Sequence, residues 1–308
     1  MDWNADGKLD ILSGCYWIQS ANEGQIQCLE GQGGNDFAES YSIKSVDDKT
    51  LANVTVPEDA AEPYDFKNIC THQHAVDYDS DGDLDLVVGC ISANFFLFRN
   101  EPKDGKPGLP TIGEQLEIAS PKGHAGPHFV DWDNDGDLDL LTGTGQGGAL
   151  ISINTGNASE PSYAKFQQLV PGTNSHEQSL DDGPVQPGPE SRVWAYDWNH
   201  DGLVDLLVGD SVTTTKRKAE LSDAKFAELK SDYEKRMQEA QDAYQKIMDE
   251  LGEIDYDNLP ADVEKKMSEA SQNMYKIMQT RSEFQTVERT GHVWLYLRKP
   301  ATEKVAAK

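Results

Sequence analysis

The sequence is short of basic residues, of long apolar runs and of closely spaced cysteine pairs. Its 308 residues include 27 Lys and Arg against 54 Asp and Glu, which gives a net charge of −27. A surface this acidic repels nucleic acid and anionic membranes, so we expect neither as a partner. No run of about 18 apolar residues occurs, so we expect no membrane insertion. The sequence also shows no signal peptide.

Motifs for common catalytic and redox sites are also absent. Cys15, Cys28, Cys70 and Cys90 form no CxxC pair, so a zinc knuckle or thioredoxin-type site has no support. Two disulfides and four free thiols both remain compatible with the sequence. No GxSxG, P-loop or HExxH motif occurs. GTGQGG (143–148) leads into a strand-like segment rather than a helix, so we interpret it as a hairpin turn. Enzymatic activity therefore has little support.

The sequence does contain one acidic motif in four copies. They read DWNADGKLDILSG (2–14), DYDSDGDLDLVVG (77–89), DWDNDGDLDLLTG (131–143) and DWNHDGLVDLLVG (197–209). A string this constrained does not recur by chance, so the copies indicate an array of similar structural units. The chain starts inside the first copy, and we expect the natural protein to extend further toward its N-terminus.

The spacing of oxygen-bearing residues in the motif predicts a cation site. Side chains at positions 1, 3, 5 and 9 and the carbonyl of position 7 can converge on one ion, and the glycine at position 6 permits the sharp turn. Calcium suits such flexible oxygen ligands best, magnesium ranks second, and zinc or copper would prefer nitrogen and sulfur. We predict about four Ca²⁺ ions. The predicted ligands are Asp2, Asn4, Asp6, Lys8 and Asp10; Asp77, Asp79, Asp81, Asp83 and Asp85; Asp131, Asp133, Asp135, Asp137 and Asp139; and Asp197, Asn199, Asp201, Leu203 and Asp205.

The motif is not an EF-hand, because position 12 offers no glutamate. Each copy instead runs into a short β-type segment that ends in glycine, and HAVDYD and HFVDWD before two of the loops are extended as well. We therefore expect each loop to join two strands of a hairpin. Third strands are predicted in GQIQCLEG, NFFLFRN, GALISINTG and HVWLYLRK, and fourth strands in ESYSIKS, EQLEIAS and YAKFQQLV.

Four-stranded units of this kind predict an all-β fold, a β-propeller with four recognisable blades. The acidic loop followed by an [IL]-[LV]-x-G strand resembles FG-GAP repeats, specifically the VCBS-type variant of bacterial secreted proteins, which is related to integrin α-subunit propellers. The resemblance covers residues 1–212 and 291–300, although the literal FG and GAP strings are absent. Family propellers have about seven blades, so the chain forms either an incomplete arc or a small ring, with room for a degenerate strand or two between Asp47 and Asn68.

The resemblance implies a function as well as a fold. It implies an exported protein, located extracellularly, in the periplasm or on the cell surface. It further implies a binding or adhesion scaffold for a protein or glycan ligand, in which calcium is structural.

Residues 213–290 interrupt the last blade and differ in composition. Apolar residues recur every three or four positions from Phe226 to Leu251 and again from Val263 to Ile277, a near-heptad pattern. We expect an antiparallel α-helical hairpin, with Gly252 ending the first helix and Pro260 in the first turn of the second. The predicted domains are propeller blades (1–212), helical hairpin (213–290), and final strand with tail (291–308). The hairpin either pairs only with itself or contacts a partner protein.

A second group of polar residues precedes the acidic loops at alternate positions, which places them on one face of the first strand. They are Cys70, His72, His74, His124, His128 and Arg192. Imidazole and thiolate could ligate a transition metal near the propeller channel, so the alternative function is a metalloenzyme or transition-metal-binding protein. The other interpretation is that these histidines pack between blades and hydrogen-bond to the backbone.

Overall fold

The computed structural model describes residues 1–16, 26–56, 65–102, 107–121, 123–181, 186–251 and 260–300. The chain divides into two compact units. Unit 1 comprises Met1–His176, Gln186–Val212 and Gly291–Lys308, and unit 2 comprises Glu177–Val185 and Thr213–Thr290. Unit 2 thus combines the insertion with a short segment that precedes the fourth acidic loop.

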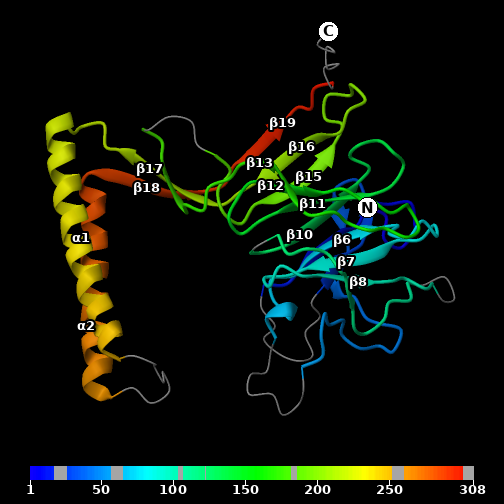
Figure 1. The fold of residues 1–308 in the computed structure, drawn as a ribbon, viewed down its shortest axis with the longest axis horizontal. Coiled ribbons are helices and arrows are strands. Elements are labelled where there is room, and N and C mark those ends of the chain that lie inside the picture. Colours follow the sequence, from blue (N-terminus) through cyan, green and yellow to red (C-terminus); the bar gives the residue numbers. More distant parts are fainter. Residues whose placement is uncertain are drawn as a thin grey trace, which may run out of the picture. The chain divides into compact units, whose positions relative to one another are not determined.

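Unit 1 is built from four small antiparallel sheets, which we call the first to fourth repeat sheets (Figure 1). The first contains β1 (Ile11–Gly14), β2 (Ile26–Leu29) and β5 (Tyr41–Ser42). The second contains β6 (His72–Val76), β7 (Asp85–Gly89), β8 (Phe95–Phe98) and β9 (Glu114–Gln115). The third contains β10 (Gly126–Val130), β11 (Asp139–Gly143), β12 (Ala149–Ser152) and β13 (Gln167–Val170). The fourth contains β15 (Arg192–Tyr196), β16 (Asp205–Gly209) and β19 (Val293–Tyr296). A separate hairpin pairs β3 (Gly31–Gly33) with β4 (Asp36–Phe37).

The acidic loops close the hairpins that the sequence predicts. In the third repeat sheet, β10 pairs antiparallel with β11, and Val130 lies opposite Asp139. The β6–β7 and β15–β16 pairs have the same register across their loops. The third strands of all four sheets and the short fourth strands of the first three lie where the sequence places them. The described residues show no strand before the first loop and no fourth strand in the fourth sheet.

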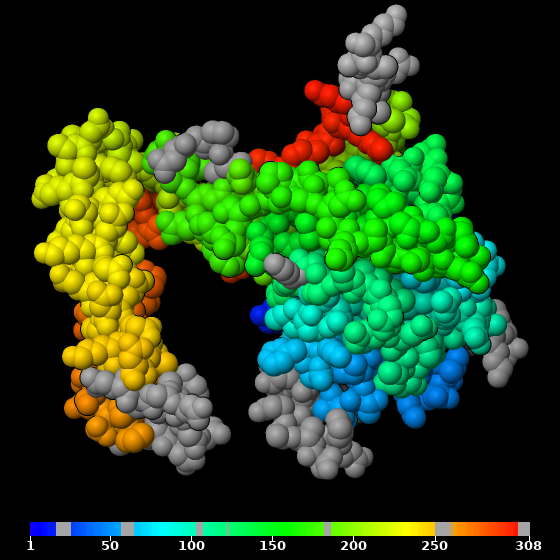
Figure 2. Space-filling view, viewed as in Figure 1, coloured from blue at the N-terminus to red at the C-terminus, as the bar shows by residue number. Residues whose placement is uncertain are grey.

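Successive repeat sheets pack against each other through three buried apolar clusters. Alternate residues of each middle strand point to opposite faces. Leu86 accordingly lies in the cluster shared with the first sheet, and Val87 lies in the cluster shared with the third. The third cluster joins Leu141 of the third sheet to Val208 of the fourth. In the space-filling view, the cyan and green segments of unit 1 form one continuous surface (Figure 2).

The described residues contain no buried cluster that joins the first repeat sheet to the fourth. The structure therefore shows a succession of packed sheets, and it does not show a closed ring.

The last glycine of the motif is explained by the neighbouring sheet. A Cβ on Gly89 would lie 2.3 Å from the carbonyl oxygen of Ala125, and one on Gly143 would lie 2.1 Å from that of Ser191. Real Cβ atoms do not approach so closely, so any side chain here would force the sheets apart. The glycine lets the backbone of the following sheet pass over the end of the middle strand.

Unit 2 consists of two long helices and a three-stranded sheet. The helices α1 (Asp223–Leu251) and α2 (Ala261–Thr280) lie side by side and run in opposite directions (Figure 1). Their apolar stripes are half-buried or buried, so they pack mainly against each other. The sheet contains β14 (Glu177–Ser179), β17 (Val212–Arg217) and β18 (Gln285–Thr290), with β14 parallel to β17. Phe284 is buried against Phe226 and Tyr233 of α1.

One sequence expectation needs correction, and a second concerns a segment that lies partly outside the described residues. The insertion is not helical throughout, because β17 and β18 flank the helices. The β-branched run Thr213–Thr215 favours a strand. The sequence analysis missed this strand because helix-forming residues dominate the composition of the insertion. The described part of the Asp47–Asn68 segment contains no strand, only isolated bridges at Thr50 and Ala52 and the 3₁₀ turn η1 (Phe66–Asn68).

Two further details concern the ends of elements. Pro260 is the residue immediately before α2 rather than part of its first turn. Gly252 and the tail from residue 301 lie outside the described residues. The structure assigns no disulfide to any of the four cysteines, all of which lie in the described part of the chain.

Candidate metal centre

The four acidic loops share one backbone conformation. The residue at motif position 4 is left-handed in each, with φ of 57° at Ala5, 60° at Ser80, 66° at Asn134 and 59° at His200. The glycine at position 6 is left-handed too, for example Gly136 with φ of 96°. Non-glycine residues adopt this conformation at a cost, so its fourfold recurrence indicates that the loop geometry is specified by the motif.

The first aspartate of each motif folds the loop around itself. Asp131 Oδ1 accepts a hydrogen bond from the Asp135 amide at 3.1 Å, and its Oδ2 accepts one from the Gly136 amide at 3.1 Å. The equivalent bonds form in the other three loops. These bonds turn the side chains of positions 1, 3 and 5 toward a common point.

The side chains at positions 1, 3 and 5 converge most clearly in the second and third loops. One oxygen from each carboxylate lies within 4.8 Å of the others in the sets Asp77, Asp79 and Asp81, and Asp131, Asp133 and Asp135. In the first and fourth loops an asparagine occupies position 3. In the first loop Lys8 Nζ also lies 3.1 Å from Asp6 Oδ2, so a tethered ammonium already neutralises one carboxylate there.

Position 7 contributes a side chain that the sequence interpretation missed. Asp83 Oδ1 and Asp137 Oδ1 are buried and have no hydrogen-bond partner among the described residues, and the same holds for Asp79 Oδ1. Burial, followed by the nearby carboxylates, raises the pKa of Asp83 and Asp137. A buried carboxylate oxygen without a partner is costly. This donor set, all oxygen and strongly anionic, fits a hard divalent cation.

Position 9 has a structural task. Asp139 is buried, its Oδ2 accepts a hydrogen bond from the Trp132 amide at 3.1 Å, and its Oδ1 accepts one from the Asn154 amide at 2.8 Å. Asp10, Asp85 and Asp205 make the equivalent pair of bonds. This carboxylate therefore ties the start of the loop to the end of the third strand, with both oxygens engaged by backbone amides.

The buried histidines connect neighbouring repeat sheets. His74 Nδ1 accepts a hydrogen bond from the Phe129 amide at 3.0 Å, and His128 Nε2 accepts one from the Ala195 amide at 3.0 Å. Their ring centroids are 4.7 Å apart. Each imidazole thus presents an unprotonated nitrogen to the first strand of the next sheet, as expected if the histidines pack between sheets.

The remaining members of the histidine and cysteine group form separate pairs. The Arg192 guanidinium contacts His72 Nε2, and the Glu190 carboxylate contacts His124 Nδ1. Cys70 lies before β6 and its Sγ is 3.6 Å from the carbonyl oxygen of Tyr16. Among the described residues the structure brings no set of histidine and cysteine ligands to one point.

We predict that these histidines make stability fall in acid. Burial lowers the pKa of His74 to about 3 and that of His128 to about 4, whereas imidazoles of the unfolded chain titrate near about 6.5. The unfolded state therefore binds more protons as pH falls from 6.5 toward 4, and folding stability is lost across that window. Urea midpoints measured through this range should fall more steeply for the wild type than for His128→Gln, whose amide oxygen can accept the Ala195 bond without titrating. Parallel curves would contradict the prediction.

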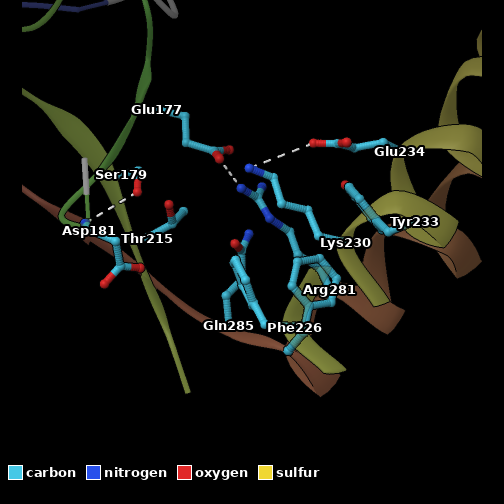
Figure 3. A pocket seen from close by; sticks show the side chains of 11 residues that line it. Glu177, Ser179, Asp181, Thr215, Phe226, Lys230, Tyr233, Glu234, Arg281 and Gln285 are labelled. Carbon is cyan, nitrogen blue, oxygen red and sulfur yellow. Dashed lines mark hydrogen bonds and ion pairs between the residues drawn. The ribbon is translucent and has the colours of Figure 1, made fainter. Parts of the chain in front are cut away.

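Unit 2 contains a cavity of about 320 Å³ between its helices and its sheet (Figure 3). Most of its charged side chains are paired with one another, and Asp181 accepts a hydrogen bond from the Arg217 amide. Arg281 contacts Glu177 and lies 6.0 Å above the Tyr233 ring, and Lys230 Nζ lies 3.9 Å from Glu234. The charged side chains of the cavity therefore have partners within the protein, and their arrangement points to no ligand.

A second hollow, of about 530 Å³, lies in unit 1 beside the third repeat sheet. Its lining includes the hydroxyl residue Thr144, the amide residues Gln146 and Gln168, Lys165 and the ring of Phe166. Side-chain amides beside an aromatic ring can bind a polar, ring-shaped ligand, whereas the Thr144 hydroxyl is already bonded to Gly147.

Comparisons with known proteins agree with the repeat organisation. The family model described as FG-GAP-like repeat matches residues 77–142, which span the second and third acidic loops. No curated protein matches the chain. Within the described residues, no helix is both long and apolar enough to cross a membrane. The family match and the loop geometry together identify residues 77–142 as an FG-GAP-like repeat.

Proposed function

We propose that this protein is a calcium-stabilised scaffold of the β-propeller type, working outside the cytoplasm, that binds a protein or glycan. The observation that carries the proposal is the pair of buried, unpartnered carboxylate oxygens at Asp83 and Asp137. A cation among them would supply the missing partner. The extracellular setting rests on the FG-GAP-like repeat, which is typical of extracellular proteins.

The residues that would hold the ion are those at motif positions 1, 3, 5 and 7. Calcium would supply positive charge and coordination to oxygens that otherwise repel one another. The chain itself prepares the loop, because the position 1 carboxylate bonds to the amides of positions 5 and 6. The position 9 carboxylate fixes the loop to the sheet. The ion is thus structural, and no step of catalysis is assigned to it.

The loops should bind calcium in two classes. The second and third loops carry aspartate at position 7, whereas the first has Lys8 and the fourth has Leu203. Calorimetric titration of the calcium-free chain should resolve two tight and two weaker sites, because affinity follows the number of charged ligands. Asp137→Asn should weaken one tight site by about tenfold. Glu39→Gln, an exposed carboxyl change outside the loops, is the matched control. Four equal sites, or no binding, would contradict this assignment.

Glycan binding can be tested at the hollow beside the third repeat sheet. The hollow beside the third repeat sheet offers the side-chain amides of Gln146 and Gln168 and the Phe166 ring, a combination that suits sugar hydroxyl groups and the apolar face of a sugar ring. Binding to immobilised glycans should weaken in a Gln146→Ala/Gln168→Ala variant while thermal stability is kept. If glycan binding is absent, a protein ligand remains, and the helical hairpin of unit 2 is then the segment to delete first.

A further inference from the structure

The second and third acidic loops offer identical carboxylates but have different surroundings. Both carry aspartate at motif positions 1, 3, 5 and 7, and in both the carboxylates of positions 1, 3 and 5 converge. Their turns also match, because the amides of positions 5 and 6 bond to the position 1 carboxylate in each. A difference in cation affinity between these two loops must therefore come from the residues around them.

A basic side chain reaches the second loop from the third strand of its sheet. Arg99 directly follows β8, and its guanidinium contacts Oδ2 of Asp79, the carboxylate at motif position 3. The pair is accessible to solvent, since the Arg99 side chain is 43% exposed and the Asp79 side chain is 23% exposed. The protein thus places a tethered positive charge on one of the carboxylates that would hold an ion.

The third loop has no such counter-ion. The strand registers make Ile153 the equivalent of Arg99, and Ile153 packs against the apolar cluster shared with the fourth sheet. Arg298 approaches this loop, but it contacts the ring and the carbonyl oxygen of Trp132. In the described part of the chain, no ion pair joins a basic side chain to a carboxylate of the third loop.

Arg99 has a second carboxylate within reach. Its Nε lies 4.0 Å from Glu114 Oε2 on β9, and its guanidinium carbon lies 5.8 Å from the centre of the Tyr78 ring. An exposed ion pair contributes little to stability. The guanidinium can therefore move from Asp79 toward Glu114 at little cost and without leaving its charge unpaired.

A calcium ion and a guanidinium that contact the same carboxylate repel each other. On the basis of the calcium sites proposed above, we propose that Arg99 is an internal counter-ion that competes with calcium for the second loop. An ion bound there displaces the guanidinium toward Glu114. The second loop therefore binds calcium more weakly than the third, although their carboxylates are the same. Calcium binding at the second loop also changes the ion pairing of β9, the outer strand of the second sheet.

Two glycine amides report the two loops separately. Gly82 and Gly136 each donate to the first aspartate of their own loop, so their NMR signals in the whole chain follow calcium binding at each loop. In the wild type, Gly136 should reach half-saturation at a lower free calcium concentration than Gly82. Arg99→Gln should lower the half-saturation concentration of Gly82 by about two- to fivefold and leave that of Gly136 unchanged. The matched control is Arg289→Gln, at an exposed arginine of unit 2, which should change neither.

A double-mutant cycle shows whether Glu114 acts through Arg99. Glu114→Gln removes the second partner of the guanidinium, so it should weaken calcium binding at the second loop. In the Arg99→Gln background the same substitution should have a much smaller effect, because no guanidinium has to be received. An equal effect in both backgrounds would show that Glu114 acts through its charge alone, which contradicts the exchange of partners.

Failure of this proposal and failure of the calcium sites give different results. If Gly82 and Gly136 saturate together, both in the wild type and in Arg99→Gln, calcium binds but Arg99 does not compete with it, and the proposal is wrong. If neither signal responds to calcium, the loops hold no calcium, and the role of Arg99 is refuted together with the sites. Melting curves in EDTA establish that each variant is folded.

Discussion

Removal of calcium is expected to lower the thermal midpoint of unit 1 by about 10 °C or more. A site that is saturated at about a hundred times its dissociation constant adds about 2.7 kcal/mol of stability. Two such sites would add about 5 kcal/mol, and each kcal/mol shifts the midpoint of a unit this size by about 2–4 °C. The repulsion among the carboxylates of each loop acts in the same direction once the ion has gone. Calorimetric scans in excess EDTA and in excess calcium measure the difference.

The chain provides an internal control for this experiment. Unit 2 contains no copy of the acidic motif, so the helical circular dichroism signal of α1 and α2 should respond much less than the tryptophan signal of unit 1. Calcium added back should restore the midpoint, and magnesium should restore it only in part. An unchanged midpoint after exhaustive chelation would rule out structural calcium.

Asp139→Ala is expected to destabilise the protein by about 3–5 kcal/mol, with or without calcium. The substitution leaves the half-buried amide of Trp132 and the buried amide of Asn154 without acceptors, and each unsatisfied buried donor costs about 1–3 kcal/mol. It also releases the loop from the third strand. Urea unfolding in EDTA and in calcium gives the two free energies of unfolding, and an effect confined to calcium would contradict the structural task assigned to position 9.

Asp135→Asn is the matched comparison in the same loop. Asp135 is exposed, and its backbone amide donates to Asp131 Oδ1. Its own Oδ1 accepts a hydrogen bond from the Asp137 amide at 3.2 Å, which the amide oxygen of asparagine can also accept. The variant should therefore unfold like the wild type in EDTA and lose stability only in calcium. The two variants together distinguish Asp139, which stabilises the loop itself, from Asp135, which is proposed to bind the ion.

The sequence predicted the loops and hairpins well because each motif position has one local physical cause. Gly136 takes the left-handed conformation that the turn requires, and the alternation of side chains along β10 and β11 determines which residues lie on each face of the sheet. The sequence could not distinguish the role of Asp139 from that of Asp137. Both are aspartates in one acidic string, and only the three-dimensional structure shows that one meets two amides while the other has a buried oxygen without a partner.

The parts that were missed depend on contacts distant in sequence. β17 and β18 form because Val212–Arg217 and Gln285–Thr290 meet in one sheet, and the helices between them dominate the composition. The histidine group posed the opposite difficulty. Its spacing resembled a metal site, but the partners of His74 and His128 are backbone amides of later strands, which no local pattern reveals.

The insertion also bears on the order in which the protein can fold. β16 pairs with β19, and between them the ribosome must make both long helices. If that connection were unstructured, the entropic cost of closing the fourth sheet would rise by about 0.6 kcal/mol for each doubling of the length of the connection. Pairing of β17 with β18 brings the two ends of the insertion together beforehand. During synthesis the first three sheets can assemble early. The fourth sheet is completed only after β19 has been made, when β17 and β18 can already have paired.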